Sequence, residues 1–434
     1  MATQQVTSSP QVGERPTRVR YWVVVFAVTL AVITYIDRAC LGFVQTDVAR
    51  DLGLSKTQMG FCFSAFIMCY ALFEIPGGFL GDWMGPRKVL MRIVIWWSCF
   101  TALTGMAWNF LSLAVTQALF GAGEAGCFPN LTKSFTAWLP GEERVRAQGI
   151  LWLSARWGGA FTPPLVFLVL KSLPSWRQAF FLFGGLGVIW AVFFYRWYRN
   201  NPRENRHVNA AELALLKANE GLATGHGHVP WAKFARSRQV WLLCLQYACL
   251  SYGWYFYMFW LPTYLREFRH LDLGRSAFLG ILPLFLGGLG SFSSGFLSAR
   301  VSRWTGSTLR TRRLMAYLAF SGAGGLLLFS TVIANPVLAM ITMGFASFCN
   351  DLAMPGSWGA CMDVGGKAAG TLSGTMNMTG NLGGMLQPIA TGFIVSVTQN
   401  WNFAFYVSAA IYFLGIFCWI FLDPVTPLEP AEAH

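Results

Sequence analysis

The sequence predicts an all-α membrane protein in which twelve transmembrane helices form two six-helix bundles. Of its 434 residues, 55% are hydrophobic and only 12% are charged, about half the ~25% that is usual in soluble domains. The mean hydropathy is +0.47. Several apolar runs reach the ~20 residues that a helix needs to cross a bilayer. The longest polar interval, 199–238, falls between the sixth and seventh runs and divides them evenly.

The apolar runs give the expected spans in chain order. We expect them at 21–46, 57–80, 89–108, 110–133, 147–170, 178–198, 239–264, 276–299, 314–333, 336–358, 368–395 and 401–422. The intervals 108–110 and 333–336 are very short, which indicates tight helical hairpins. The expected organisation is a tail at 1–20, a bundle at 21–198, a central loop at 199–238, a bundle at 239–422 and a tail at 423–434.

The distribution of basic residues predicts the orientation. With the N-terminus inside, the tail and the inner loops carry 23 of the 32 Lys and Arg residues, and the outer loops carry seven. Cytoplasmic loops collect such residues, so we expect both termini in the cytoplasm and the chain in the cell (inner or plasma) membrane. The same loops account for the net charge of +13 without a nucleic-acid partner. The polar segment 1–20 leads directly into the first span, so we expect no cleaved signal peptide.

Two stretches at equivalent places hint at an internal repeat. "GFLGDWMGPRK" follows the second span, and "GFLSARVSRWTG" follows the eighth. Both begin with Gly-Phe-Leu and end in a basic loop. Repeated halves of this kind place a binding site near the membrane midplane, between the halves.

The stretch "GGFLGDWMGPRKVL", residues 77–90, resembles the signature loop of the major facilitator superfamily. Asp82 can accept hydrogen bonds at a helix end, and the basic residues suit the headgroup region. Trp83 stands where many members carry a basic residue. The resemblance implies the major facilitator fold and a conformational gating loop formed by Gly78, Asp82, Gly85, Arg87 and Lys88.

Further motifs over nearly the whole chain resemble one branch, the anion:cation symporter family. They are "YIDRACLG", "YALFEIPGGFLGD", "GAGEAGCFPN", "WLPGEERVRAQG", "WLPTYL" and "SGTMNMTGNLGG". The motifs resemble the bacterial sugar-acid branch of this family, which includes galactonate, glucarate and hexuronate carriers. The resemblance implies import of a small carboxylate together with protons.

The coupling protons are expected on carboxylates, because all five histidines lie outside the spans. An ionisable residue at membrane depth suggests a functional role. The family uses acids at the positions of Asp37 and Glu124 as protonation sites, so we expect both to titrate; the alternative is a static pair with Arg156. Glu74 could pair with loop cations or take part in coupling. Asp351 could satisfy an opened helix backbone near Pro355 or contact substrate.

Apart from Arg92, Lys133 and Arg196 near the span ends, Arg38 and Arg156 are the only cations within the expected spans. Arg38 matches the family arginine that contacts the anionic substrate, and an internal salt bridge is the alternative. Many members carry another arginine in the fourth span where this chain has Gln117. Arg156 lies instead in the fifth span. We therefore expect an exchanged pair, with Arg156 near Glu124 and Gln117 hydrogen-bonded to that arginine.

Polar and aromatic side chains complete the candidate substrate pocket. Asn377 and Asn381 are four residues apart and share a helix face. Tyr70 matches a family tyrosine that contacts substrate. Packing is the alternative role for any single aromatic residue. The expected substrate-binding residues are Arg38, Tyr35, Tyr70, Arg156, Gln117, Tyr252, Tyr255, Tyr257, Ser357, Trp358, Asn377 and Asn381.

These observations predict a proton-coupled symporter that imports an organic anion, such as an aldonate, aldarate or hexuronate, by alternating access. We expect no enzymatic activity, no cofactor besides the coupling protons, no metal and a monomer in the lipid bilayer. The ten cysteines are scattered singly and read as small buried apolar residues. An exporter of the same fold or a membrane sensor without transport remain alternatives. Exporters typically carry Gly-Pro-x-x-Gly-Gly in the fifth span, which "RWGGAFTPPL" lacks.

Overall fold

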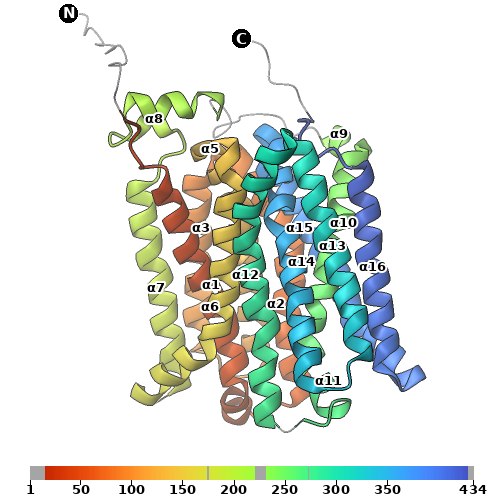
Figure 1. Cartoon of the computed structure of the whole chain (residues 1–434). Coiled ribbons are helices and arrows are strands. Elements are labelled where there is room, and N and C mark those ends of the chain that lie inside the picture. Colours follow the sequence, from red (N-terminus) through yellow and green to blue (C-terminus); the bar gives the residue numbers. More distant parts are fainter. Residues whose placement is uncertain (1–14, 174, 220–230, 272, 429–434) are drawn as a thin grey trace, which may run out of the picture.

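The computed structural model describes residues 15–173, 175–219, 231–271 and 273–428, which form a bundle of long, roughly parallel and antiparallel helices (Figure 1). Residues 1–14, 220–230 and 429–434, which belong to the expected tails and central loop, lie outside the described residues. So do residues 174 and 272.

The described helices supply twelve membrane-crossing segments, as expected. The first six are α1 (Tyr21–Leu52), α2 (Lys56–Met84), α3 (Pro86–Thr104), α4 (Phe110–Glu124) with α5 (Cys127–Trp138), α6 (Gly141–Ser172) and α7 (Trp176–Trp197). The second six are α10 (Arg238–Phe259) with α11 (Leu261–Glu267), α12 (Leu273–Thr305), α13 (Thr308–Val332), α14 (Pro336–Gly365), α15 (Ala369–Thr398) and α16 (Trp401–Phe421). Shorter elements are η1 (Pro202–Glu204), α8 (Ala210–Leu215), η2 (Lys217–Asn219), α9 (Trp231–Arg236) and η3 (Gly366–Ala368).

Length and hydropathy alone identify seven stretches of the described chain as candidate spans, and one of them, Pro336–Val395, contains both α14 and α15. One segment outside this set is α6. Another is the fourth span, which is divided between α4 and α5.

Local signals define the two short turns, which follow α3 and α13. Asn109 and Ser112 form a capping box at the start of α4, so the turn after α3 needs only residues 105–109. Asn335 caps α14 by accepting hydrogen bonds from the backbone of Val337 and Leu338. These caps satisfy backbone N–H groups that a helix start leaves without partners. Both tight hairpins expected from the sequence are therefore present.

The fourth span is broken directly after Glu124, where the sequence predicted one helix over 110–133. Ala125 is extended, with ψ 143°, and Gly126 is left-handed, with φ 82°. Gly126 packs against Gly77 of α2, where a Cβ on either glycine would lie 2.6 Å from the Cα of the other. Only glycine adopts this backbone and permits this approach without strain. The break places Glu124 at the last position of α4.

The two halves repeat the same helix packing. In the first half α1 packs on α6, α2 on α4, and α3 on α7. In the second half α10 packs on α15, α12 on α14, and α13 on α16. In terms of spans, the pairings are first with fifth, second with fourth, and third with sixth in each half. Two six-helix bundles result, and α2 with α15 and α6 with α12 form the main contacts between them.

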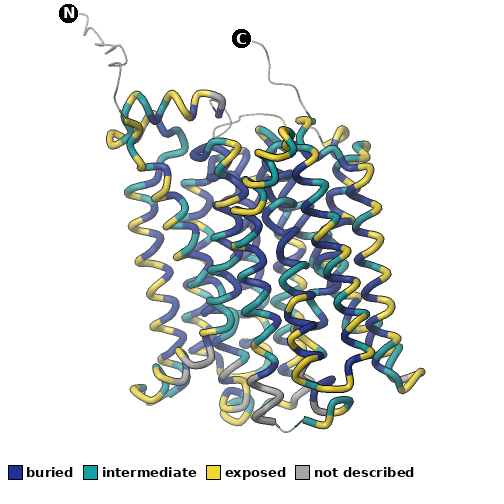
Figure 2. The backbone as a smooth tube through the Cα atoms, in the orientation of Figure 1, coloured by how far each residue is buried: buried dark blue, intermediate teal, exposed yellow. Residues whose placement is uncertain are grey.

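Burial follows the pattern expected in a bilayer. Figure 2 shows buried backbone in the interior and exposed positions along the outer faces of the helices. Large apolar side chains such as Phe193, Phe329 and Phe417 are exposed on those faces. An apolar surface of this extent suits lipid contact and would be a liability in water.

A charged cluster joins the first helix to α6 and to the central loop. Arg20 donates to Glu143 of α6 at 2.9 Å and to Glu212 of α8 at 3.0 Å. The bond to Glu143 raises the pKa of Arg20 above its ordinary value. Burial opposes ionisation of Glu143, but hydrogen bonds from Arg20 and Tyr21 hold the pKa of Glu143 below its ordinary value. The charged forms of this cluster are therefore favoured in the folded chain.

Candidate functional site

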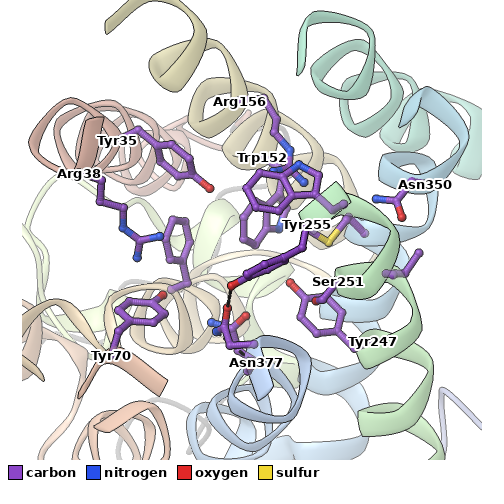
Figure 3. A pocket seen from close by; sticks show the side chains of 15 residues that line it. Tyr35, Arg38, Tyr70, Trp152, Arg156, Tyr247, Ser251, Tyr255, Asn350 and Asn377 are labelled. Atoms are coloured by element: carbon purple, nitrogen blue, oxygen red, sulfur yellow. Dashed lines mark hydrogen bonds between the residues drawn. The ribbon is translucent and has the colours of Figure 1, made fainter. Parts of the chain in front are cut away.

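A cavity lies between the bundles and encloses about 580 Å³ of empty space, part of which opens to solvent. Both bundles supply its wall (Figure 3). The lining residues are Tyr35, Arg38, Tyr70, Phe128, Trp152, Arg156, Tyr247, Leu250, Ser251, Trp254, Tyr255, Asn350, Met354, Asn377 and Asn381. A mostly aromatic wall with a few polar groups is typical of a small-molecule site.

Arg38 on α1 forms an ion pair with Glu124, with 2.6 Å between Nε and Oε1. The Glu124 side chain is fully buried, whereas the Arg38 side chain retains 24% of its exposure and lines the cavity. The pair is incompletely satisfied, because Nη2 of Arg38 and Oε2 of Glu124 lack hydrogen-bond partners. The Arg38 guanidinium also faces the Tyr70 ring, 4.4 Å from its centroid. Arg38 therefore has donors to offer an anion in the cavity.

Asp37, the neighbour of Arg38, faces away from the cavity. It is buried at 3% exposure, and both of its carboxylate oxygens lack hydrogen-bond partners. The Trp97 indole of α3 lies close enough to interact with it, although the Trp97 Nε1–H completes no hydrogen bond either. A charged carboxylate without a cation or a donor is unfavourable at membrane depth. The neutral, protonated form suits this environment.

The expected pair of Arg156 and Glu124 is wrong. Arg156 binds Asp351 of the other bundle, with 2.7 Å from Nε to Oδ2 and 3.0 Å from Nη2 to Oδ1. Both side chains are almost fully buried. The physical reason is that α6 packs on α12 and α14 of the second bundle, so Arg156 faces across the interface. Glu124 is paired with Arg38 instead.

Gln117 does not bond to Arg156 as expected. Its amide donates to the Thr104 hydroxyl at 3.0 Å, within the first bundle, and Gln117 does not line the cavity. The loss of an arginine from the fourth span is therefore not compensated by a local exchange. Arg156 instead pairs with Asp351 on α14 of the other bundle.

The surroundings of Asp351 are fully hydrogen-bonded. Asn350 donates to Asp351 Oδ1 at 2.9 Å. Pro355 lacks the N–H that would bond the Asp351 carbonyl one turn earlier, and the Ser291 hydroxyl donates to that carbonyl at 3.3 Å. The opened backbone expected near Pro355 is thus satisfied by Ser291, and the Asp351 carboxylate is left to bind Arg156.

Two glycines of α12 make room for this pair. A Cβ on Gly287 would lie 2.7 Å from Asp351 Oδ2. A Cβ on Gly288 would lie 2.9 Å from the Trp157 ring and 3.3 Å from the Cβ of Arg156. The segment "FLGGLGSFSSG" is therefore shaped around the contact between the bundles.

The expected pocket residues divide into two groups. Tyr35, Tyr70, Tyr255, Asn377 and Asn381 line the cavity, and Tyr255 donates to Asn381 at 3.0 Å (Figure 3). Four others lie behind the wall and do not line it, namely Tyr252, Tyr257, Ser357 and Trp358. Tyr257 donates to the Met343 carbonyl and Ser357 to the Gln246 side chain.

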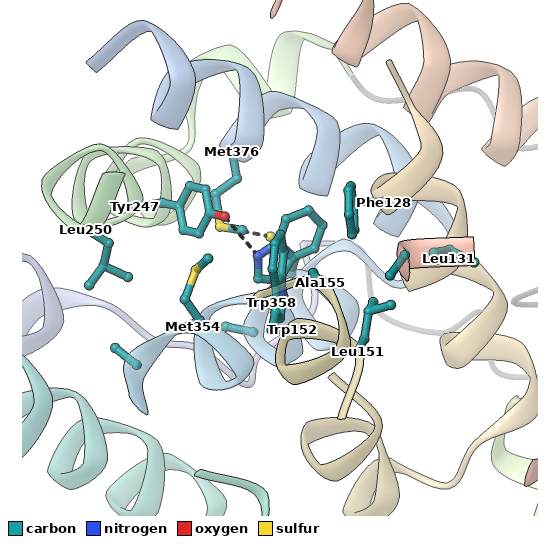
Figure 4. Packing of buried hydrophobic residues seen from close by; sticks show 14 of the residues in the cluster. Phe128, Leu131, Leu151, Trp152, Ala155, Tyr247, Leu250, Met354, Trp358 and Met376 are labelled. Carbon is teal, nitrogen blue, oxygen red and sulfur yellow. Dashed lines mark hydrogen bonds between the residues drawn. The ribbon is translucent and has the colours of Figure 1, made fainter. Parts of the chain in front are cut away.

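Aromatic side chains from both bundles form the floor of the cavity, on the side nearer the start of α6. Trp152 stacks on Phe128 with 4.9 Å between ring centroids and contacts Trp358 at 5.4 Å. Trp358 donates its Nε1–H to the Tyr247 hydroxyl (Figure 4). Trp152 lies one turn closer than Arg156 to the start of α6.

Below this floor, Asp82 of the expected gating loop joins the bundles. It accepts hydrogen bonds from the backbone of Gly370 and Thr371 at the start of α15 and pairs with Lys133 at 3.0 Å. The backbones of Gly78 and Gly370 are in close contact.

The rest of the gating loop stays within the first half. Gly85 has φ 81° at the junction of α2 and α3. Arg87 donates to the Tyr195 carbonyl, and Lys88 is exposed. The role of this loop in gating stays a prediction.

Glu74 is a further buried acid at the interface. It accepts a hydrogen bond from the Asn377 amide at 2.5 Å, while its second oxygen lacks a partner. No ion pair joins it to a cation among the described residues, so the pairing with loop cations considered from the sequence is not present.

Sequence reasoning missed several cavity residues, among them Trp152, Tyr247, Ser251, Trp254 and Asn350. The aromatic ones had no distinguishing signal in a chain that is 16% aromatic. The pair of Arg156 and Asp351 had one: Asp351 is an in-span acid of the second half without an assigned cation, and Arg156 is an in-span cation of the first half.

Comparison with known proteins agrees with the motifs. The family model described as "Major Facilitator Superfamily" matches residues 27–388. A probable sulfoacetate transporter of Cupriavidus necator is 33% identical over 402 residues, covering 92% of this chain and 93% of the relative. A probable galactarate/D-glucarate transporter of Escherichia coli strain K12 is 30% identical, covering 90% of each. A probable L-galactonate transporter of the same strain is 28% identical, covering 90% of this chain and 86% of the relative. The resemblance to the organic-anion branch is confirmed.

Solved structures confirm the fold. The structure of a proton:xylose symporter of the same superfamily superimposes with a TM-score of 0.74 at 12% identity, covering 95% of this chain and 98% of the other. The Escherichia coli fucose:proton symporter superimposes with a TM-score of 0.66 at 15% identity, covering 93% of this chain and 99% of the other. Identities this low concern the fold alone.

Proposed function

The chain belongs to the Major Facilitator Superfamily, a family of transporters and not of enzymes, and we propose that it imports a small organic anion together with protons. The relatives named for sulfoacetate, galactonate and galactarate or glucarate all carry anions with one or two acidic groups. A cavity at mid-membrane depth between two bundles suits alternating access to the two sides.

The pairing of Arg38 with Glu124 carries the proposal. The arginine side chain lines the cavity and is 24% exposed, while its carboxylate partner is fully buried behind it. Guanidinium groups bind carboxylate and sulfonate oxygens through parallel hydrogen bonds. An anion that enters the cavity therefore competes with Glu124 for the same guanidinium.

Proton coupling follows from that competition. When the anion takes the Arg38 donors, Glu124 loses its counter-charge in a site without water access. A buried, unpaired carboxylate is costly, so Glu124 then takes up a proton. Asp37 already lacks both donors and cations, and we assign it a second, more persistent proton. Transport of the anion and uptake of protons are thereby linked.

Uptake by the purified, full-length protein in proteoliposomes tests this proposal. Labelled sulfoacetate and labelled galactonate serve as probes, with and without a pH gradient that is acidic outside. We expect accumulation driven by the gradient. Glu124→Gln and Asp37→Asn should each abolish that accumulation, while Glu124→Gln keeps part of the substrate exchange. Normal accumulation by either variant would refute its assignment.

The same assay separates the rival functions. An exporter would lose the labelled anion from the vesicles in exchange for protons, and a sensor would move neither probe in either direction. Arg38→Lys should fail as a transporter, because an ammonium is a point charge and does not reproduce the planar fork. Retained binding of anions by Arg38→Ala would remove Arg38 from the site.

A further inference from the structure

Arg156 offers the cavity more donors than its ion pair uses. A guanidinium carries five N–H donors. Asp351 occupies the edge formed by Nε and Nη2. The remaining donors lie on the terminal edge of the group, and Arg156 lines the cavity. Trp254 packs on the guanidinium with 4.2 Å from its carbon to the ring centroid, which fixes the plane of the group.

The two cavity arginines lie on either side of Tyr35. Arg38 is three residues after Tyr35 on α1, and its guanidinium is 5.6 Å from the Tyr35 ring. Gly159 is three residues after Arg156 on α6, and a Cβ there would lie 3.1 Å from that same ring. Arg38 thus lies about one helical turn, ~5 Å, from Tyr35 along α1. Arg156 lies about one helical turn, ~5 Å, along α6 from Gly159, where the Tyr35 ring contacts that helix. Figure 3 shows Tyr35 between the two arginine side chains.

Two cations around one cavity favour a ligand with two acidic groups. Each arginine is balanced by one carboxylate, Glu124 or Asp351, so the empty site is close to neutral. A monoanion needs only the Arg38 donors and leaves the terminal edge of Arg156 unused. A second acidic group on the ligand would fill that edge with charge-assisted hydrogen bonds.

We propose that Arg156 is a specificity-determining residue whose terminal edge binds the second acidic group of a dianionic substrate. This inference rests on the proposed function, in which Arg38 binds the first acidic group. Asp351 holds Arg156 in place from the second bundle, so the second acidic group binds at the contact between the bundles. The substrate class is a short organic dianion with an acidic group at each end.

Matched pairs of ligands test the proposal by titration calorimetry on the purified full-length protein. Sulfoacetate is compared with 2-hydroxyethanesulfonate, and galactarate with galactonate. In each pair a carboxylate is replaced by a hydroxymethyl group, which removes one charge at similar size. We expect the wild-type protein to bind the preferred dianion about ten- to hundredfold more tightly than its monoanionic match, the range of one charge-assisted contact.

The variants identify the residue that carries this preference. Arg156→Gln combined with Asp351→Asn removes both charges of the pair, so no buried charge is left without a partner. In this double variant the ratio of the two affinities should fall to about one, while monoanion binding changes only a few-fold. Arg156→Lys, which keeps the charge without the fork, should retain an intermediate ratio. If Arg156 has only a structural role, the double variant should bind both ligands more weakly by the same factor, and the ratio of the two affinities should stay unchanged.

The outcomes separate this inference from the proposed function. Equal affinities for both members of each pair in the wild-type protein would overturn the inference, even if the double variant does not fold. An undiminished dianion preference in the double variant would overturn it as well. If Arg38→Gln still binds every ligand, or if no ligand binds the wild-type protein, the proposed function fails and the inference fails with it.

Discussion

Two ion pairs face the same cavity, and they differ in how completely their hydrogen bonds are made. The pair of Arg38 and Glu124 lies within one bundle, is joined by one bond, and leaves one atom of each partner without a hydrogen bond. The pair of Arg156 and Asp351 joins the two bundles through two bonds, and Asn350 adds a third to the carboxylate. The first pair is also open to the cavity through Arg38, whereas both members of the second are almost fully buried.

This difference indicates that the two ion pairs have different functions. A partly satisfied pair can exchange its carboxylate for a substrate anion at low cost, because the competing states make similar numbers of hydrogen bonds. A buried pair whose carboxylate is fully hydrogen-bonded is expensive to break on one side, since the remaining charge has no partner. The first pair is therefore suited to proton exchange and the second to holding a fixed cation between the bundles.

Removing one partner of the second pair should have the largest effect on stability. Asp351→Asn leaves the Arg156 charge buried and unpaired, and we expect a loss of about 3–5 kcal/mol. Glu124→Gln should cost only about 1 kcal/mol, because Arg38 retains access to the cavity and its water. Thermal unfolding in detergent measures both.

The double variant Arg156→Gln with Asp351→Asn is the control for this stability prediction. It should recover part of the loss, since neither charge is then left alone. Equal destabilisation by Asp351→Asn and Glu124→Gln would mean that the two pairs do not differ as their hydrogen bonds suggest.

Replacing Arg38 should have the next largest effect, and this effect is on ligand binding and not on stability. Arg38→Gln removes the charge-assisted contact to the anion, so affinity for every anion should fall by about 1.5–3 kcal/mol. Arg50→Gln on the same helix is a matched control, because the Arg50 side chain is 75% exposed and its pair with Asp47 spans 3.7 Å. Calorimetry on the purified variants measures the difference. Similar losses in both variants would point to a nonspecific effect of net charge.

The same comparison shows what the sequence could predict. Apolar run lengths and the central polar interval were enough for twelve spans in two bundles, because these follow from membrane thickness and chain order. The in-span charge of Arg38 correctly indicated a residue on the cavity wall. Arg156 was assigned to Glu124 because both lie in one half, and spacing along the chain carries no information about contacts between the halves. The partner of Arg156 depends on how α6 meets α12 and α14, which is a property of the assembled bundles.

The break after Glu124 was hidden for a related reason. Gly121, Gly123 and Gly126 surround that acid, and small residues in membrane helices usually indicate close helix contacts. Gly126 is also the left-handed residue that ends the helix against Gly77 of α2. A glycine that permits close packing and one that permits a positive φ look alike in a sequence, and only the tertiary contact distinguishes them.

A steric change can disturb the second pair without altering any charge. Gly287→Ala places a methyl group about where Asp351 Oδ2 lies, 2.7 Å from the new Cβ, so the carboxylate must shift. We expect destabilisation of about 1–3 kcal/mol, the usual cost of overpacking, and a reduced preference for dianions. Gly280→Ala on the same helix is the control, because nothing lies within 4 Å of its added Cβ. An unchanged melting temperature and ligand preference in Gly287→Ala would show that the position of Asp351 does not hold Arg156.

Tyr35 should give the smallest effect, and it tests whether the two pairs act on one ligand. Its ring touches the surroundings of both arginines, through Arg38 on α1 and Gly159 on α6. Tyr35→Phe keeps the ring, so binding should change by no more than about 0.5 kcal/mol, because a cation–π contact at an accessible site contributes little more than that in total. Tyr35→Ala removes the spacer between the arginines and should weaken dianions by about 1 kcal/mol more than monoanions. If Tyr35→Ala weakens the two ligand classes equally, the ring does not set the distance between the cations, and the two pairs then bind independently of each other.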